Sequence, residues 1–222
     1  MKKAVLVVVA VVATLCAPRA NATTEIRLIN GLSDTGWIVN AGNSVTFSGT
    51  VGNYSLNVST GISSNGVNPF LDLSSVDMTG VASAGTLIIE TLAPDYTVDT
   101  PAFNFEVGGT NALGGPVSFN AYGGNNDLSC VAGINACSPT SLGLTGIGST
   151  LTFNSSPFAG MTGGTGNTEN PYSLAIVADL DGVNAGSASF DAGINAVPEP
   201  GSLALMGSGL IGLAGLLRRK LL

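Results

Sequence analysis

The side chains that this 222-residue chain could use for catalysis are few. It contains no histidine, and its three lysines are Lys2, Lys3 and Lys220, near its two ends. Ser-His-Asp and Cys-His nucleophiles, Ser-Lys systems, Schiff-base lysines and histidine metal centres are therefore excluded from the central part of the chain. A glycosidase needs only two suitably placed carboxylates, so the fourteen Asp and Glu residues leave that one reaction class open.

Two of the three cysteines, Cys130 and Cys137, are separated by six residues in a stretch rich in Gly and Asn. In an oxidising compartment we expect them to form a disulfide, which would contribute about 2.5 kcal/mol by the chain-entropy relation. A zinc site is the alternative, but two thiols without a histidine are a poor ligand set. We predict a disulfide and no metal site.

The segment Asp179-Leu180-Asp181-Gly182-Val183-Asn184 resembles the start of a calcium loop, because oxygen ligands stand at alternate positions. An EF-hand loop also needs Gly at its sixth position and Glu at its twelfth, where this chain has Asn184 and Phe190. A tight Asp-Gly hairpin turn between two strands is the commoner meaning of such a segment. That turn is our prediction, and calcium binding stays as the alternative.

The N-terminus has the layout of a secretory signal peptide. Lys2 and Lys3 precede an apolar run over residues 4–15, and Ala20-Asn21-Ala22 fits the small-x-small cleavage rule. The run is too short to be a comfortable membrane span. We therefore predict that residues 1–22 form a signal peptide helix that is removed, and that the mature protein begins after it.

Residues 197–222 repeat this layout in reverse. Val197-Pro198-Glu199-Pro200-Gly201 precedes an apolar segment of 16 residues, 202–217, and then the basic cluster Arg218, Arg219 and Lys220. A spanning helix has roughly 17 to 25 apolar residues, so this predicted transmembrane helix suits a thin bilayer or snorkelling flanks. Because basic clusters stay in the cytoplasm, the central part of the chain should lie on the far side of the inner membrane.

This tail has a Pro-Glu-Pro sequence, an apolar segment and a basic cluster in that order, and so resembles the PEP-CTERM sorting signal of Gram-negative bacteria. The membrane protease exosortase recognises that signal. The resemblance implies that Pro198, Glu199 and Pro200 are recognised and that the tail is removed or exchanged near them. It also implies that the body reaches the cell surface or the exopolysaccharide matrix, after transient residence in the inner membrane. The alternative is a plain C-terminal membrane anchor behind a Pro-rich linker.

The body of the chain, residues 23–197, carries more negative charge than the overall value of −7 suggests. Of the fourteen acidic residues only Glu199 lies outside residues 23–197, and of the seven basic residues only Arg27 lies inside them, which gives a net charge of −12. Phosphate contacts need clusters of Lys and Arg. We therefore exclude nucleic acid as a partner.

Alternation of apolar and polar residues predicts that residues 23–196 form one all-β domain. Residues 45–51 and 54–58 alternate on either side of Gly52-Asn53, whose chemistry favours a two-residue hairpin turn. The other predicted strands cover 25–30, 37–40, 71–78, 86–92, 96–99 after a turn at Pro94-Asp95, 103–107, 117–122, 151–153, 172–180 and 188–194.

Many short strands punctuated by Gly, Pro and Asn predict an antiparallel β-sandwich of jelly-roll-like topology, with about ten strands and little helix. We expect surface loops at 123–148 and 154–170. Trp37 is the only tryptophan. We expect it in the core, although a sugar-stacking role is the alternative.

Together these features predict an exported, non-enzymatic protein of the cell surface or extracellular matrix. The resemblance of its tail implies that it is sorted by an exosortase and associated with the exopolysaccharide of a biofilm. The alternative is a polysaccharide-binding or glycoside-hydrolysing module delivered by the same tail. The predicted partners are the exosortase and exopolysaccharide, and no cofactor is expected.

Overall fold

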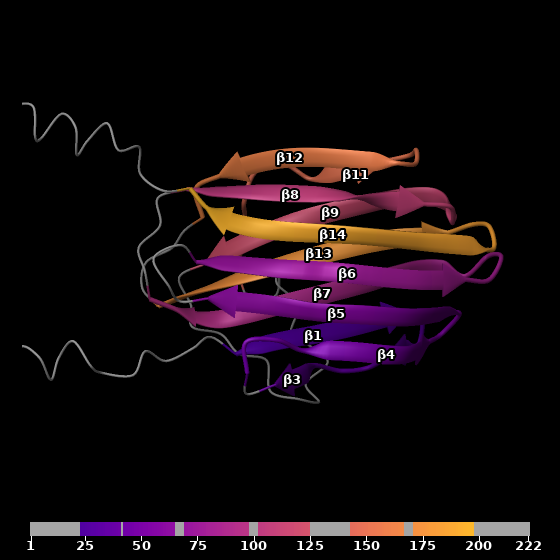
Figure 1. Ribbon diagram of the computed structural model, residues 1–222, viewed down its shortest axis with the longest axis horizontal. Coiled ribbons are helices and arrows are strands. Elements are labelled where there is room, and N and C mark those ends of the chain that lie inside the picture. The colour runs from indigo at the N-terminus through magenta and orange to yellow at the C-terminus, as the bar shows by residue number, and fades with distance from the viewer. Residues whose placement is uncertain are drawn as a thin grey trace, which may run out of the picture.

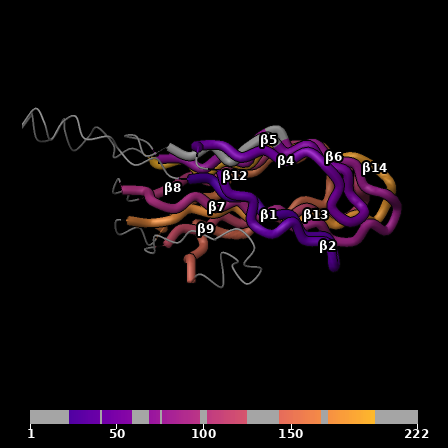
Figure 2. The backbone as a smooth tube through the Cα atoms, turned by 90° about the horizontal axis from the view of Figure 1, so that it is seen from below, coloured from indigo at the N-terminus to yellow at the C-terminus, as the bar shows by residue number. Residues whose placement is uncertain are grey.

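The computed structural model describes residues 23–40, 42–64, 69–97, 102–124, 143–166 and 171–197, with the backbone alone for 59–64 and Ser75. Within these residues the chain forms strands β1 to β14 and no helix. The strands make two antiparallel sheets that pack face to face (Figures 1 and 2). The predicted antiparallel β-sandwich is therefore confirmed.

The two predicted terminal helices lie outside the described residues. The part of the chain that the structure describes has no helix with the length and apolar character needed to cross a membrane.

One sheet, which we call sheet A, has the strand order β10-β9-β13-β7-β1-β2, with β11 also paired to β9 and β3 to β1. Its strands are β1 (Thr24–Asn30), β2 (Ser33–Asp34), β3 (Ile38–Asn40), β7 (Gly85–Tyr96), β9 (Gly114–Gly124), β10 (Thr145–Gly146), β11 (Leu151–Phe153) and β13 (Tyr172–Gly182). Its border strands are very short.

Sheet B faces the viewer in Figure 1 and has the order β12-β8-β14-β6-β5-β4. Its strands are β4 (Thr46–Val51), β5 (Tyr54–Ser64), β6 (Phe70–Gly80), β8 (Phe103–Asn111), β12 (Phe158–Gly164) and β14 (Gly186–Ala196). The last strand of the chain, β14, is thus a central strand with neighbours on both sides.

The core fills the space between the sheets with alternate side chains from each strand, as period-2 patterning requires. Phe119 of sheet A meets Phe190 of sheet B edge to face, with ring centroids 5.0 Å apart, and Tyr96 stacks on Tyr172 at 5.2 Å. All four side chains are at most 2% exposed. Each buried aromatic ring stabilises the sandwich by about 1.5–3 kcal/mol.

The hairpin predicted around Gly52-Asn53 is confirmed, since β4 pairs with β5 from Val51↔Tyr54 onwards. Gly52 has a φ of +56°, while Asn53 is not among the residues with positive φ. This combination is expected of a type II′ turn, which requires Gly at its first central position.

The predicted turn at Pro94-Asp95 is wrong, because β7 continues through both residues to Tyr96. The register of β7 against β13 shifts between the pairs Leu174↔Ala93 and Tyr172↔Tyr96, so two residues of β7 lie opposite one of β13. This bulge accommodates a proline that lacks an N–H and the φ of +67° at Asp95. Of the strand predicted at 96–99, Tyr96 is the last residue of β7, and residues 98 and 99 lie outside the described residues.

Two further predictions are corrected. The segment around Asp181-Gly182 does not make a hairpin, because β13 belongs to sheet A and β14 to sheet B, so the turn crosses between the sheets. The loop predicted over 154–170 contains β12, whose composition, Phe-Ala-Gly-Met-Thr-Gly-Gly, gives a weak strand signal. Of the loop predicted over 123–148, residues 125–142 lie outside the described residues.

Candidate functional site

The outer face of sheet B carries a row of short polar side chains that crosses five strands. Their backbones are in register across β4, β5, β6, β14 and β8, in the order Ser48, Asn57, Asp77, Ser189 and Thr110. These positions face outward because their sequence neighbours Leu56, Met78 and Ala188 point into the core. Five strands at a spacing of about 4.8 Å extend over about 19 Å.

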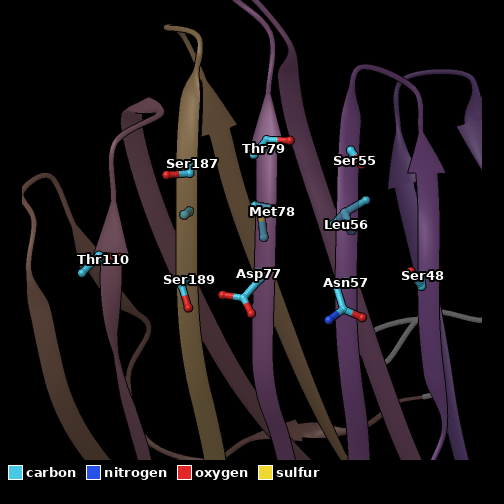
Figure 3. A pocket seen from close by; sticks show the side chains of 11 residues that line it. Ser48, Ser55, Leu56, Asn57, Asp77, Met78, Thr79, Thr110, Ser187 and Ser189 are labelled. Carbon is cyan, nitrogen blue, oxygen red and sulfur yellow. The ribbon is translucent and has the colours of Figure 1, made fainter.

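An open groove of about 440 Å³ follows this row. Ser55, Thr79 and Ser187, one alternate position further along their strands, line its second side, as Figure 3 shows. The groove therefore presents hydroxyl groups, one amide and one carboxylate in a nearly flat array. The hydroxyl and amide groups donate and accept hydrogen bonds without a charge, and the carboxylate of Asp77 accepts them.

A second, acidic hollow of about 360 Å³ lies on the same face, over β6, β8 and β14. Asp72, Glu106 and Asp191 line it. The pKa of Asp72 is raised, first by burial and then by the negative charge of Asp191. The face of sheet B thus repels anions. Among the described residues, no group of three or more carboxylates or thiols is placed to hold a metal ion.

The outer face of sheet A carries the ionic contacts of Arg27, the one base of the body. Its guanidinium donates hydrogen bonds to Asp34, with Nε 3.0 Å from Oδ1, and lies with Nη1 3.5 Å from Oε2 of Glu90. The hydrogen bond from Arg27 lowers the pKa of Asp34. The same contact raises the pKa of Arg27. This cluster uses Arg27 internally, so the base is not available to an outside anion.

Glu90 is an acid whose pKa is strongly raised. Burial raises its pKa to about 7, and the nearby Asp34 and Asp179 carboxylates act in the same direction, while Arg27 opposes them. Burial also raises the pKa of Asp179, which lies two residues along β13 from the position opposite Glu90. Both side chains stand on the outer face of sheet A, away from the groove on sheet B.

Trp37 is a packed residue, in agreement with the prediction. Its side chain is 2% exposed and lies in a small cluster on the outer side of sheet A with Leu92, Leu144 and Ala175, against which Tyr122 packs. A ring buried in this way offers no platform for a sugar. The groove on sheet B has no aromatic residue in its lining.

The predicted site residues Cys130, Cys137, Pro198, Glu199, Pro200, Arg218, Arg219 and Lys220 all lie outside the described residues. The predicted disulfide, sorting motif and basic cluster therefore stay predictions of the sequence. Sequence reasoning did not find the groove. The only sign of the groove in the sequence was Ser, Thr and Asn at alternate positions of several strands. The order of the strands in the sheet was needed to show that these residues lie together.

The C-terminal end of the folded body is well defined. β14 ends at Ala196, whose N–H donates to the carbonyl of Pro69 at 3.1 Å, and the N–H of Val197 donates to the carbonyl of Ala102 at 2.9 Å. Residues 196–220 match the family model of the PEP-CTERM protein-sorting motif. The tail is therefore a PEP-CTERM motif. This motif indicates an exported protein that an exosortase sorts, and here it begins at the last residue of β14.

No curated protein matches the chain. Among solved structures, the K1 cleaved adhesin domain of Lys-gingipain from Porphyromonas gingivalis W83 has a TM-score of 0.35 and 10% identity, over 71% of this chain and 99% of that one. TmCBM27, a carbohydrate-binding module that recognises mannan, has a TM-score of 0.31 and 9% identity over 70% and 99%. TmCBM61 in complex with β-1,4-galactotriose has a TM-score of 0.32 and 6% identity over 54% and 68%. Likenesses this low assign no ligand.

Proposed function

We propose that this chain is a non-enzymatic protein of the cell surface or extracellular matrix, delivered by its PEP-CTERM tail and associated with exopolysaccharide. The observation that carries the proposal is the position of the motif, which starts at residue 196, where the last strand of the body ends. Delivery and folding are thus encoded in adjoining segments that meet at Ala196 and Val197.

The geometry of the junction supports this division. Every described strand precedes the Pro198-Glu199-Pro200 sequence, and the backbone bonds of Ala196 and Val197 fix the chain just before it. A cut or exchange after Val197 would leave all fourteen strands with their partners. An exosortase could therefore act on the tail of a body that is already folded.

The groove on sheet B favours polysaccharide contact, the alternative function that the sequence left open. Its Ser, Thr and Asn side chains can exchange hydrogen bonds with the hydroxyl groups of a sugar chain. The carboxylates on this face and the engaged state of Arg27 favour a neutral polymer over an anionic one. We propose the groove as the surface that contacts a neutral polysaccharide.

The sorting proposal is tested by replacing Pro198, Glu199 and Pro200 with alanine in the full chain. Because the predicted signal peptide is untouched, the variant should still be exported. We expect it to remain uncut in the inner membrane fraction, whereas the control Gly201→Ala/Ser202→Ala should be sorted like the wild type. A plain anchor predicts that the alanine variant fractionates and migrates as the wild type does.

The groove is tested separately with the host's own exopolysaccharide, divided by anion exchange into a neutral and an acidic fraction. We expect saturable binding of the mature protein to the neutral fraction, weakened at least tenfold in Asn57→Ala/Ser189→Ala. The control Ser118→Ala/Thr152→Ala, whose hydroxyls lie 3.1 Å apart on sheet A, should bind normally. Binding to neither fraction, or equal binding by both variants, would contradict the proposal that the groove contacts a neutral polysaccharide. Release of sugar would contradict the proposal that the body is not an enzyme.

A further inference from the structure

The two sheets differ in how their borders are built. Sheet A ends in β2 and β10, each of two residues, and its other border strands, β3 and β11, have three. β2 also carries Asp34. Very short border strands and charged residues are devices that prevent a sheet from pairing with another chain. Sheet A is therefore protected against further strand addition.

Sheet B lacks these devices at both of its borders. β4 has six residues and β12 has seven, and neither contains a charged residue or a proline. Both pair with their single neighbour without a shift of register, so neither border has a bulge. The register shifts of this sheet occur in the interior pairs β5–β6 and β14–β6. Straight, uncharged border strands of this length are templates for strand pairing.

The direction of the strands allows one copy to continue the sheet of the next. Each neighbouring pair in sheet B is antiparallel, so across six strands β12 and β4 run in opposite directions (Figure 1). A second copy in the same orientation would therefore place its β12 antiparallel to β4. The described body begins and ends at one end of the sandwich, away from the middle of both borders (Figure 1).

We propose that copies of the protein join β4 of one to β12 of the next, so that sheet B extends through a head-to-tail chain. About six residues of each strand can pair, because β4 has six. Met161 of β12 is 63% exposed and, with Glu106, lines an open hollow. The added strand would bury part of the Met161 side chain. Such a contact uses two different surfaces, and copies that repeat in the same orientation do not close into a ring, so it produces open chains.

Two lysine substitutions, one at each border, test this arrangement. Met161→Lys places a charge on β12 and Thr46→Lys places one on β4, and both side chains are exposed. Val183→Lys is the matched control, because Val183 is 51% exposed but lies in the turn between β13 and β14. The measurement is sedimentation velocity of the exported protein, purified from whichever host fraction contains it, over a hundredfold range of concentration.

The wild type and Val183→Lys should show an average sedimentation coefficient that rises continuously with concentration. Met161→Lys alone and Thr46→Lys alone should stay monomeric, each with one blocked border. An equal mixture of the two should form a dimer and nothing larger, because each supplies the border that the other lacks. Unchanged thermal unfolding of all three variants excludes misfolding as the cause.

Three results would overturn the proposal. A wild type that stays monomeric at every concentration shows that the borders do not pair. Dimers formed by Thr46→Lys alone show that β12 pairs with β12 in a two-fold arrangement. Assembly of Met161→Lys like that of the wild type shows that another surface is used. None of these measurements involves exopolysaccharide or the tail, so they stand apart from the proposed function.

Discussion

Arg27 of β1 and Glu90 of β7 lie directly opposite each other on the outer face of sheet A, with Nη1 3.5 Å from Oε2. Their side chains are 8% and 7% exposed. A carboxylate this buried loses most of its hydration, and one guanidinium shared with Asp34 does not replace it. This explains why the pKa of Glu90 is raised to about 7 although a cation stands beside it.

Glu90 should make the protein more stable in mild acid than in mild base. Its pKa is about 7 in the folded state against an ordinary 4.5, so between these values the folded state keeps a proton that the unfolded state releases. Its contribution is fully present below pH 4.5 and is lost as the pH rises through 7. One pKa unit corresponds to about 1.4 kcal/mol, so the loss amounts to a few kcal/mol.

Urea unfolding of wild type and Glu90→Gln at pH 5 and pH 8 measures this effect. The wild type should be clearly less stable at pH 8, and the variant should lose most of the difference. Asp72 and Asp179 also have raised pKa values, so the stability of the variant should still fall with rising pH, but less than that of the wild type. Asp34 has a lowered pKa, so its contribution is lost only in stronger acid. If the free energy of unfolding changed equally between pH 5 and pH 8 in wild type and variant, Glu90 would be ionised in the folded state.

Arg27→Gln should destabilise the protein by about 3–5 kcal/mol at pH 8, because it leaves the buried Glu90 carboxylate without a cation. The cost should be smaller at pH 5, where Glu90 is protonated. Asp34→Asn is the control, since Asp34 is the more exposed partner, at 20%. The double variant Arg27→Gln/Glu90→Gln should recover part of the stability at pH 8. A cost independent of pH would argue that Arg27 acts by packing alone.

Gly109 of β8 has no room for a side chain. A Cβ atom there would lie 2.3 Å from the carbonyl oxygen of Ser189, whereas at the neighbouring Gly108 the nearest atom would be 3.8 Å away. We expect Gly109→Ala to cost about 1–3 kcal/mol in urea unfolding and Gly108→Ala to be nearly neutral. Similar values for the two variants would show that β14 can shift away from β8.

The fold was largely predictable because inward positions alternate along long strands, such as Phe103 and Phe105 in β8. The groove was not, because Ser48 and Ser189 belong to strands far apart in the sequence, and their shared row depends on the sheet order. β12 was missed since three of its seven residues are glycine, which does not favour strands. Pro94 gives a turn signal that the bulge in β7 overrides.

Cys130 and Cys137 give a prediction that the sequence alone supports. In the mature, exported protein we expect no free thiol until a reductant is added. Alkylation of the unfolded, unreduced protein should give no mass shift, and alkylation after reduction should add two groups. Two groups without reduction would refute the disulfide. Reduction should leave urea unfolding of the sandwich cooperative, because the closed loop is small beside the core.

The intact mass of the protein isolated from the cell surface is the most direct test of sorting by the PEP-CTERM tail. The described structure requires residues up to Val197, because β14 and the bond from Val197 to Ala102 complete the centre of sheet B. We expect a C-terminus between Val197 and Gly201, bearing whatever group the exchange adds. A surface protein that retains Leu222 would contradict sorting by this tail and leave an exported sandwich on a membrane anchor.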